Sequence, residues 1–229
     1  MSPRMNIGFR ILRRTRQVDA ATIARFRAVP VANVSDSMAR LSGGGANLRP
    51  MHRGAPMAGP ALTVRTRPGD NLMVHKALDL AAPGDIVVVD AGGALDQAII
   101  GDLMLNHAIA RGLGGIVING AVRDLDFIRG QDLPVYAAGV IHRGPYKDGP
   151  GEINAPIALD GMVIEPGDLI LGDADGLVCV PYAALAEILA AAEAKMAAET
   201  NQREAILAGT SDRTWIDTTL TRLGCSMDD

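Results

Sequence analysis

The sequence has few aromatic residues and few cysteines. Aromatic residues make up only 3% of the 229 residues, and the two cysteines are Cys179 and Cys225. Two cysteines cannot build a disulfide framework or a four-cysteine zinc site, and we expect Cys179, in the apolar run GLVCV, to be a core residue. Few rings are available to stack single-stranded bases, and a net charge of −4 argues against a general polyanion binder. We therefore expect no nucleic-acid partner.

Long apolar runs and the commonest catalytic motifs are also missing. No run of about 18 uncharged apolar residues occurs, so we expect no membrane span. The segment from Ile7 to Leu12 is short and contains Arg10, unlike a signal peptide. The motifs G-x-x-x-x-G-K-S/T, H-E-x-x-H, G-x-S-x-G and C-x-x-C are absent. These absences predict a cytoplasmic, reducing setting and no membrane partner.

The composition is that of a globular chain with a basic start. Hydrophobic residues make up 48% and charged residues 21%, enough apolar material for a packed core. The first 16 residues hold five arginines and no acid, which favours an arm lying on the surface or on a neighbouring subunit, with nucleic-acid contact as the alternative. We expect a basic arm over 1–17, a catalytic domain over 18–182, and a C-terminal helix and tail over 183–229.

The pattern along the chain predicts alternating helices and strands. Asp19 is a plausible N-cap, and the glycines at 43–45 are expected to stop the second helix. The long last helix carries an apolar stripe at steps of three and four. We predict helices over 19–28, 31–41, 71–82, 101–111, 124–130 and 183–207, and strands over 61–67, 85–91, 115–119, 135–138, 162–164, 169–171 and 177–180. This order indicates a layered α/β domain with a mixed sheet.

The segment GDLMLNHAIARGLGGIVINGAVRD, over 101–124, joins two features that suit an anionic ligand. A helix opening at Gly101 would direct the amides of Leu103 and Met104 outward, as a seat for a small carboxylate. Arg123 and Asp124 follow a buried strand, at the strand end where α/β proteins bind ligands. The Arg fork can grip a carboxylate, and the Asp suits Mg²⁺ or Mn²⁺. An ordinary surface ion pair or a helix cap stays open as the alternative for these two residues.

The same segment resembles the signature G-D-x-x-x-x-x-A-x-x-R-G-x-x-G-x-V-I-x-G-x-x-R-D of the RraA-like family. The segments over 68–75, 83–85, 142–145 and 166–181 fit as well, so the resemblance runs over about 18–209. The family includes class II pyruvate aldolases acting on 4-hydroxy-4-methyl-2-oxoglutarate and 4-carboxy-4-hydroxy-2-oxoadipate. The resemblance implies an α-β-β-α sandwich of the swivelling-domain type, assembled as homotrimers or homohexamers with the site at the subunit interface.

The resemblance also implies a role for each matching residue. Arg123 would bind the pyruvate end and stabilise enolate charge, Asp124 would ligate a divalent metal, Mg²⁺ or Mn²⁺, and Asp102 would hold a metal-bound water. Glu199 would reach the site from a neighbouring subunit. Backbone amides that hold the pyruvate carboxylate would come from Gly101, Asp102, Leu103 and Met104.

Other polar residues give weaker signals. Glu199 lies three residues after Met196, so it continues the apolar stripe of the last helix; a solvated charge is the alternative. Asp36 stands where the aldolases tend to have a glutamate, and its shorter side chain leaves its role open. His75 and His107 lie on expected helices, where a structural role is more usual. His142 is expected in a loop near the mouth of the site.

We therefore expect metal-dependent cleavage of a 4-hydroxy-2-oxo dicarboxylic or tricarboxylic acid to pyruvate and a second oxo acid. Oxaloacetate decarboxylation through the same pyruvate enolate should accompany it. The alternative is a non-enzymatic regulator that binds and inhibits a ribonuclease; the long last helix and the basic arm favour the aldolases, whose regulatory relatives are shorter. A methyltransferase is disfavoured because the loop after DIVVVD lacks the G-x-G-x-x-G spacing.

Overall fold

The computed structural model describes residues 6–41, 46–54 and 56–226. Within this part, ten strands join in one mixed sheet whose main path runs β1-β8-β3-β4-β6-β7-β2, with β5 beside β6 and the β11–β12 hairpin beside β3. The four strands β3, β4, β6 and β7 are parallel. The bounds are β1 Phe9–Ile11, β2 Arg49–Pro50, β3 Met57–Thr66, β4 Ile86–Asp90, β5 Ala98–Ile100, β6 Gly115–Val122, β7 Val135–Val140, β8 Gly151–Ile153, β11 Leu169–Asp173 and β12 Gly176–Val180.

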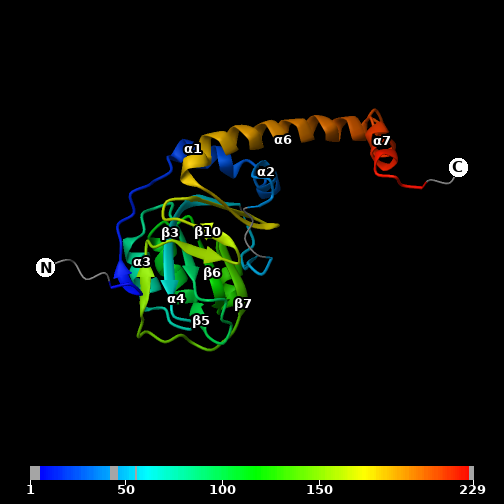
Figure 1. Ribbon diagram of the computed structural model, residues 1–229. Helices are drawn as coiled ribbons and strands as arrows, with labels where there is room; N and C mark the ends of the chain where they lie inside the picture. The colour runs from blue at the N-terminus through cyan, green and yellow to red at the C-terminus, as the bar shows by residue number, and fades with distance from the viewer. Residues whose placement is uncertain (1–5, 42–45, 55, 227–229) are drawn as a thin grey trace.

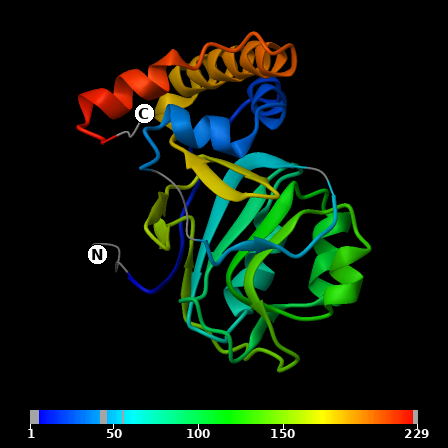
Figure 2. The same ribbon diagram turned by 90° about the vertical axis from the view of Figure 1, so that its right-hand side faces the viewer.

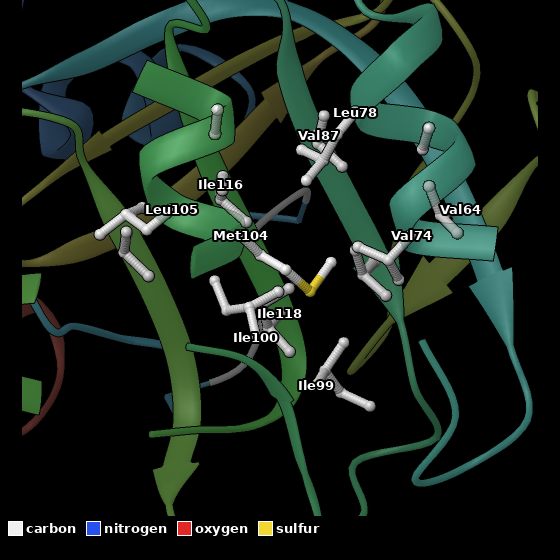
Figure 3. Close-up of a cluster of buried hydrophobic side chains, with 14 of the residues drawn as sticks. Val64, Val74, Leu78, Val87, Ile99, Ile100, Met104, Leu105, Ile116 and Ile118 are labelled. Atoms are coloured by element: carbon white, nitrogen blue, oxygen red, sulfur yellow. The ribbon is translucent and has the colours of Figure 1, made fainter. Parts of the chain in front are cut away.

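One face of the parallel strands is covered by α3 (Leu72–Leu80), α4 (Asp102–Ala110) and α5 (Leu125–Arg129). Figure 3 shows this core, where Val74 of α3 and Met104 of α4 lie among Ile116, Ile118 and other strand residues. β4 reads IVVVD because its first four residues are buried on both faces, as a central parallel strand requires. This layer fixes the start of α4 over the sheet.

The opposite face carries two more layers. The β9–β10 hairpin (Ile157–Leu159 and Met162–Ile164) and part of the β11–β12 hairpin bury a second core against Val88 and Tyr136. Beyond them, α1 (Ala20–Arg27), α2 (Val31–Ser37) and the start of α6 (Leu185–Leu207) enclose a third core around Phe26. Figures 1 and 2 show these outer helices above the sheets. The α-β-β-α sandwich is the expected fold.

The C-terminal helices leave the body of the molecule. After the one-turn helix Tyr182–Ala184, α6 packs on α2 through the expected stripe, with Leu189 and Ala192 buried. Its second half projects outward, and α7 (Thr214–Arg222), which the pattern did not reveal, lies at its tip (Figure 1). α7 buries none of its residues, and Trp215 is 63% exposed. We call α7 and the second half of α6 the helical arm.

Several element ends differ from the prediction. α2 stops at Ser37, four residues before the predicted end, because Ala39 and Arg40 adopt left-handed conformations with φ of 56° and 62°. The glycines predicted to stop it fall among 42–45, outside the described residues. β3 starts at Met57 and β6 continues to Val122, past Gly120, where we expected it to end. In α4, Met104, Leu105 and Ala108 are buried, whereas Ile109, which we place on the same face as Leu105 and Ala108 from the spacing, is 39% exposed.

The basic arm, from residue 6 on, lies along its own chain. β1 pairs with β8, and Arg10 Nε lies 2.7 Å from the carboxylate of Glu152. Arg14 pairs with the buried Asp85 at 2.8 Å. These arginines neutralise acids of the same chain, so the arm lies on the surface, as one of our alternatives expected. Within the described ranges, no helix is long and apolar enough to span a bilayer.

Candidate functional site

The sheet brings the two ends of the segment 101–124 together. β5 and β6 are parallel neighbours, with Ile100 opposite Val122, and the Arg123 amide donates to the Ile100 carbonyl at 3.0 Å. α4 begins directly after β5, while Arg123 and Asp124 follow directly after β6. The start of a helix and an Arg-Asp pair therefore meet at the carboxyl edge of the sheet.

Asp124 and Asp102 close the start of α4. The Asp102 amide donates to Asp124 Oδ2 at 3.0 Å, and the Leu103 amide donates to the Asp102 side chain at 2.7 Å. Arg123 Nε lies 3.5 Å from the same Asp124 oxygen. The first amides of the helix thus already hold anionic oxygens of the protein, where we had expected them to be open. For a ligand carboxylate to bind the Leu103 amide, the Asp102 side chain would have to rotate away from it.

The backbone at this point is special. Asp124 has φ 59° and ψ 43°, a left-handed conformation that few residues other than glycine accept. Gly101 has an ordinary extended φ of −146°, but a Cβ there would collide with Asp124 Oδ2 and lie 2.9 Å from Arg123 Nε. A Cβ on Gly144 would lie 3.2 Å from Arg123 Nη1. The Arg-Asp pair is thus packed between two glycines.

A cavity of about 250 Å³ opens beside this pair. At its floor, the amide of Asn71 (2% exposed) donates to the Ile99 carbonyl at 2.9 Å and contacts Met104 Sδ at 3.1 Å, while its Oδ1 accepts no hydrogen bond from the described residues. That oxygen can accept from a water or a ligand hydroxyl. The lining residues are Asn71, His75, Ile99, Ile100, Gly101, Asp102, Leu103, Met104, Arg123, Gly144, Pro145 and Lys147.

Asp70 fixes the loop that forms one wall of this cavity. Its carboxylate is fully buried and accepts the amides of Leu72, Asp148 and Gly149 at 2.7–2.9 Å. Arg67 also lies 3.2 Å from the same carboxylate. The P-G-D-N turn, which we had noted only as part of the family resemblance, thus anchors the loop over 144–149. An Asp that directly follows Pro-Gly in a turn is the sequence signal that could have indicated this role.

The histidines divide between the cavity and the surface. His75, on α3, lines the cavity. Its pKa is lowered mainly by burial and, to a smaller extent, by the positive charge of Lys147. His107 lies 3.2 Å from Asp79 on the helix surface. His142, which we expected in a loop near the mouth of the site, does not line the cavity; Gly144, Pro145 and Lys147 from the following residues do.

Glu199 belongs to a different cluster within this chain. Its carboxylate accepts from Asn33 at 2.7 Å and pairs with Lys195 at 3.2 Å, and Lys195 also pairs with Asp36 at 3.1 Å. The Asn33 hydrogen bond and Lys195 hold the pKa of Glu199 below its usual value. This cluster joins α2 to α6, at the opposite end of the body from α4 in both views (Figures 1 and 2). One chain alone therefore does not bring Glu199 to Arg123.

The oxygen donors at the cavity edge suit one kind of metal. In the described part of the chain, no three or more His, Cys, Asp or Glu side chains gather in a metal-binding group. Asp124, whose side chain is 38% exposed, and Asp102 are the carboxylates beside the start of α4. Mg²⁺ keeps most of its water shell and needs only one or two protein carboxylates. These residues therefore fit Mg²⁺ or Mn²⁺ and would not build a closed zinc site.

Comparisons with known proteins agree with the fold. The sequence model of the RraA-like family, described as Aldolase/RraA, matches residues 31–179. A protein of Halalkalibacterium halodurans named "Putative 4-hydroxy-4-methyl-2-oxoglutarate aldolase" is 37% identical over 190 residues, which span 83% of this chain and 90% of that protein.

Two solved structures extend the comparison to regulators. Streptomyces coelicolor RraAS2, described as an unusual member of the RNase ES inhibitor RraA family, superposes with a TM-score of 0.75 and 25% identity over 82% of this chain and 98% of its own. The RNA-processing inhibitor RraA of Thermus thermophilus superposes with a TM-score of 0.61 and 29% identity, over 66% of this chain and 92% of its own. Since RraAS2 matches so much of this chain, length does not separate aldolases from the inhibitor family, contrary to our sequence argument.

Proposed function

This chain belongs to the RraA-like family, and from that premise we propose that it is a divalent-metal-dependent pyruvate aldolase. Its substrate would be a 4-hydroxy-2-oxo dicarboxylic or tricarboxylic acid, of the 4-hydroxy-4-methyl-2-oxoglutarate type. The observation that carries the proposal is that Gly101 and Arg123 line one cavity, while Asp124 lies directly behind them, 3.5 Å from Arg123 Nε. The likeness to proteins named as aldolases supports it.

Arg123 is the main substrate-binding group in this proposal. Its guanidinium lies at the cavity edge, 40% exposed, and can donate two parallel hydrogen bonds to the carboxylate and oxo oxygens of a 2-oxo acid. The amides of Leu103 and Met104 lie at the positive end of α4, where they would add a second seat for the carboxylate once the Asp102 side chain leaves the Leu103 amide. Together they orient the C3–C4 bond of the substrate in the cavity.

Asp124 would hold the divalent metal, Mg²⁺ or Mn²⁺, and Asp102 would hold a water of that metal. When bound, such an ion supplies a Lewis acid that polarises the C2 oxo group of the substrate. The left-handed backbone of Asp124 keeps its short side chain against the start of α4. That restraint orients the carboxylate before the substrate arrives.

The chemical step moves one proton and one electron pair. The Asp102 carboxylate, freed from the Leu103 amide, accepts the C4 hydroxyl proton, directly or through a water. The C3–C4 bond breaks, C4 becomes a carbonyl carbon, and the electron pair forms the pyruvate enolate. Arg123 donates to the enolate oxygen as its charge develops. The proton returns to C3 and gives pyruvate; loss of CO₂ from oxaloacetate leaves the same enolate.

We propose that assembly completes the site. Glu199 lies on α6, which projects from the body (Figure 1), away from the cavity of its own chain. If Glu199 takes part in the reaction, it must therefore do so at the cavity of a second copy. A homotrimer or homohexamer is the proposed assembly, with Glu199 of one subunit near Arg123 of another. To test this, the Glu199→Gln and Arg123→Ala proteins, each expected to be inactive, are mixed and allowed to exchange subunits. Activity should return, because a mixed assembly contains interfaces that combine an intact Arg123 with an intact Glu199.

The proposed reaction is tested by pyruvate release. The purified chain is given 4-hydroxy-4-methyl-2-oxoglutarate, and separately oxaloacetate, with Mg²⁺ and then with EDTA. We expect turnover of both that EDTA abolishes, and its loss in Asp124→Asn. The matched control is Asp126→Asn, a fully exposed acid two residues away. EDTA-resistant turnover, with Lys147 trapped by borohydride and pyruvate, would mean a Schiff-base aldolase instead.

The second candidate is a ribonuclease regulator, favoured by the likeness to RraAS2. It predicts stoichiometric binding to a ribonuclease of the RNase ES type and no pyruvate release from the folded protein. Calorimetry with the purified ribonuclease, run beside the pyruvate assay, separates the two functions.

A further inference from the structure

The two reactions proposed for this site differ in how the pyruvate enolate regains a proton. In aldol cleavage the Asp102 carboxylate takes the C4 hydroxyl proton and can return it to C3. Oxaloacetate brings no hydroxyl proton, so loss of CO₂ leaves the enolate beside an Asp102 carboxylate that has no proton to donate. Decarboxylation therefore needs a second proton donor next to the substrate.

His75 is the cavity residue with the chemistry for this task. The titratable side chains of the cavity lining are those of Asp102, Arg123, Lys147 and His75. Arg and Lys keep their protons at neutral pH, whereas an imidazole gains or loses one between about pH 5 and 8. Within the described part of the chain, the histidine rings that make hydrogen bonds are those of His52 and His107. Both ring nitrogens of His75 are therefore available to a ligand in the cavity.

Helix α3 fixes the place of the His75 ring. The His75 amide donates to the Asn71 carbonyl at 3.0 Å, in the first turn of the helix. Val74 and Leu78, its neighbours on α3, are buried in the core, so the helix cannot turn its cavity side away. The imidazole is joined to the helix by a single CH₂ group, so the position of the helix largely sets that of the ring. His75 is otherwise exposed, and its ring can exchange a proton with solvent between turnovers.

The size of the cavity brings His75 close to the substrate. Its volume is about 250 Å³, with His75 on one wall and Arg123 on another. Sites for small molecules usually measure about 300–1,000 Å³. An oxo acid held by Arg123 therefore fills much of this cavity and lies close to its other walls.

The surroundings of His75 favour its neutral form. The charged or titratable groups around the ring and the cavity are Lys147, Asp79, His107, Asp102 and Arg123. Burial is the main cause that lowers the pKa of His75 below its usual value, and the charge of Lys147 is the next. Asp79 raises this pKa and His107 lowers it, both to a smaller extent. The ring is thus mostly neutral at pH 7, and its protonated fraction grows as the pH falls.

We propose that His75 is the acid-base residue for the methyl carbon of pyruvate, which it protonates after decarboxylation. The C3–C4 bond of oxaloacetate breaks, C4 leaves as CO₂, and the electron pair of the bond forms the enolate. That pair then binds the proton of the His75 imidazolium at C3, and the neutral ring regains a proton from water. In the reverse direction, the neutral ring removes a C3 proton from bound pyruvate. This inference rests on the proposed function, since it assumes that the cavity binds pyruvate and its enolate.

Two reactions other than aldol cleavage test the inference. Exchange of the pyruvate C3 protons in D₂O with Mg²⁺ is followed by NMR, and pyruvate release from oxaloacetate is measured beside it. The variants are His75→Asn, which keeps a polar group that carries no proton near neutral pH, and His75→Ala, with and without added imidazole. His107→Asn is the matched control, because His107 pairs with Asp79 on the helix surface and does not line the cavity. Cleavage of 4-hydroxy-4-methyl-2-oxoglutarate is measured for every variant.

We expect His75→Asn and His75→Ala to lower exchange and decarboxylation about a hundredfold. Aldol cleavage should fall by less than about threefold, since that reaction carries its own proton. Imidazole should restore both lost reactions in His75→Ala. In wild type and His107→Asn, exchange should rise and decarboxylation should fall as the pH rises through the pKa of His75, because exchange needs the neutral ring and decarboxylation the charged one. Both pH dependences should disappear in His75→Asn.

Exchange in His75→Asn within about threefold of wild type would overturn the inference, because water or Asp102 would then supply the proton. An equal loss of aldol cleavage would also overturn it, because His75 would then have a structural or general binding role. So would a wild type that cleaves the 4-hydroxy acid but exchanges no pyruvate protons. If wild type cleaves no 4-hydroxy acid but exchanges pyruvate protons in a His75-dependent way, the proposed function fails and the inference stands.

Discussion

Gly101→Ala should inactivate the site and leave the fold nearly intact. The new Cβ would collide with Asp124 Oδ2 and lie 2.9 Å from Arg123 Nε, so both side chains must move. φ at residue 101 is −146°, which alanine accepts, so the backbone itself is not strained. The perturbation therefore falls on the Arg-Asp pair.

The stability cost can be worked from the contact that is lost. When Asp124 moves, its hydrogen bond with the Asp102 amide breaks. A bond to a charged group contributes about 1.5–3 kcal/mol to stability, and the 38% exposure of this carboxylate reduces the cost to about 1 kcal/mol. For a chain of this size that lowers Tm by about 2–4 °C. A displacement of about 1 Å in the binding groups lowers kcat/KM about a hundredfold.

Three alanine variants form a graded series for the assay. Gly130→Ala, whose Cβ would lie 3.5 Å from its nearest neighbour, should behave as wild type. Gly144→Ala, at 3.2 Å from Arg123 Nη1, should lose activity modestly, and Gly101→Ala most. Pyruvate release gives the activity and circular dichroism gives Tm. A folded Gly101→Ala with activity within about threefold of wild type would refute the reasoning.

Three further predictions follow from the same contacts. Arg123→Lys should lower kcat about a hundredfold with an unchanged Tm, because an ammonium group cannot donate the parallel pair of hydrogen bonds. Asp70→Asn should destabilise the fold by about 2–4 kcal/mol, and hydrogen exchange of the two loop amides that it holds should accelerate. Lys195→Met should raise the pKa of Glu199 in an NMR titration, because only the larger cause, the hydrogen bond from Asn33, remains. A carboxylate whose pKa is lower in the folded than in the unfolded chain stabilises the fold above its unfolded pKa, and this contribution is lost as the pH falls through its folded pKa. Because the folded pKa of Glu199 is higher in the variant, acid unfolding of Lys195→Met should begin at a higher pH.

The order of the layers could be read from the sequence because each main element has a clear period. The short β-branched runs at 85–91 and 115–119 favoured buried strands, and the stripe of the last helix predicted its packing on the body. Asp19 was identified as an N-cap and accepts the Thr22 amide at 2.9 Å. Short strands of two or three residues, such as β2 and β8, carry too few residues to show a period.

The end of α2 shows where local patterns fail. Its chain reversal uses Ala39 and Arg40 in the left-handed region, where glycine is the usual signal, so the pattern favoured a longer helix. The Arg40 amide closes the turn on the Ser35 carbonyl at 3.1 Å. Asp36 pairs with Lys195 from far along the chain. That contact depends on the tertiary fold, which spacing cannot reveal.

The sequence predicted which segment carries the site, but it did not predict which other residues line the cavity. Residues 101–124 carry their own signal, because a helix start and an Arg-Asp pair follow neighbouring strands. Lys147 and Asn71 joined the same cavity only through the loop that Asp70 anchors. The hydrogen bond from the Leu103 amide to the Asp102 side chain depends on a side-chain rotamer, about which sequence gives no information.

The helical arm carries the chain's single tryptophan, Trp215, which makes its fluorescence a local reporter. Emission from an indole that is 63% exposed should shift to the blue when another copy covers the arm, so a dilution series reads the assembly directly. The same emission is blind to the three cores of the sandwich, which contain no tryptophan. A melting curve followed by this fluorescence would therefore report the unfolding of the helical arm and not that of the sandwich.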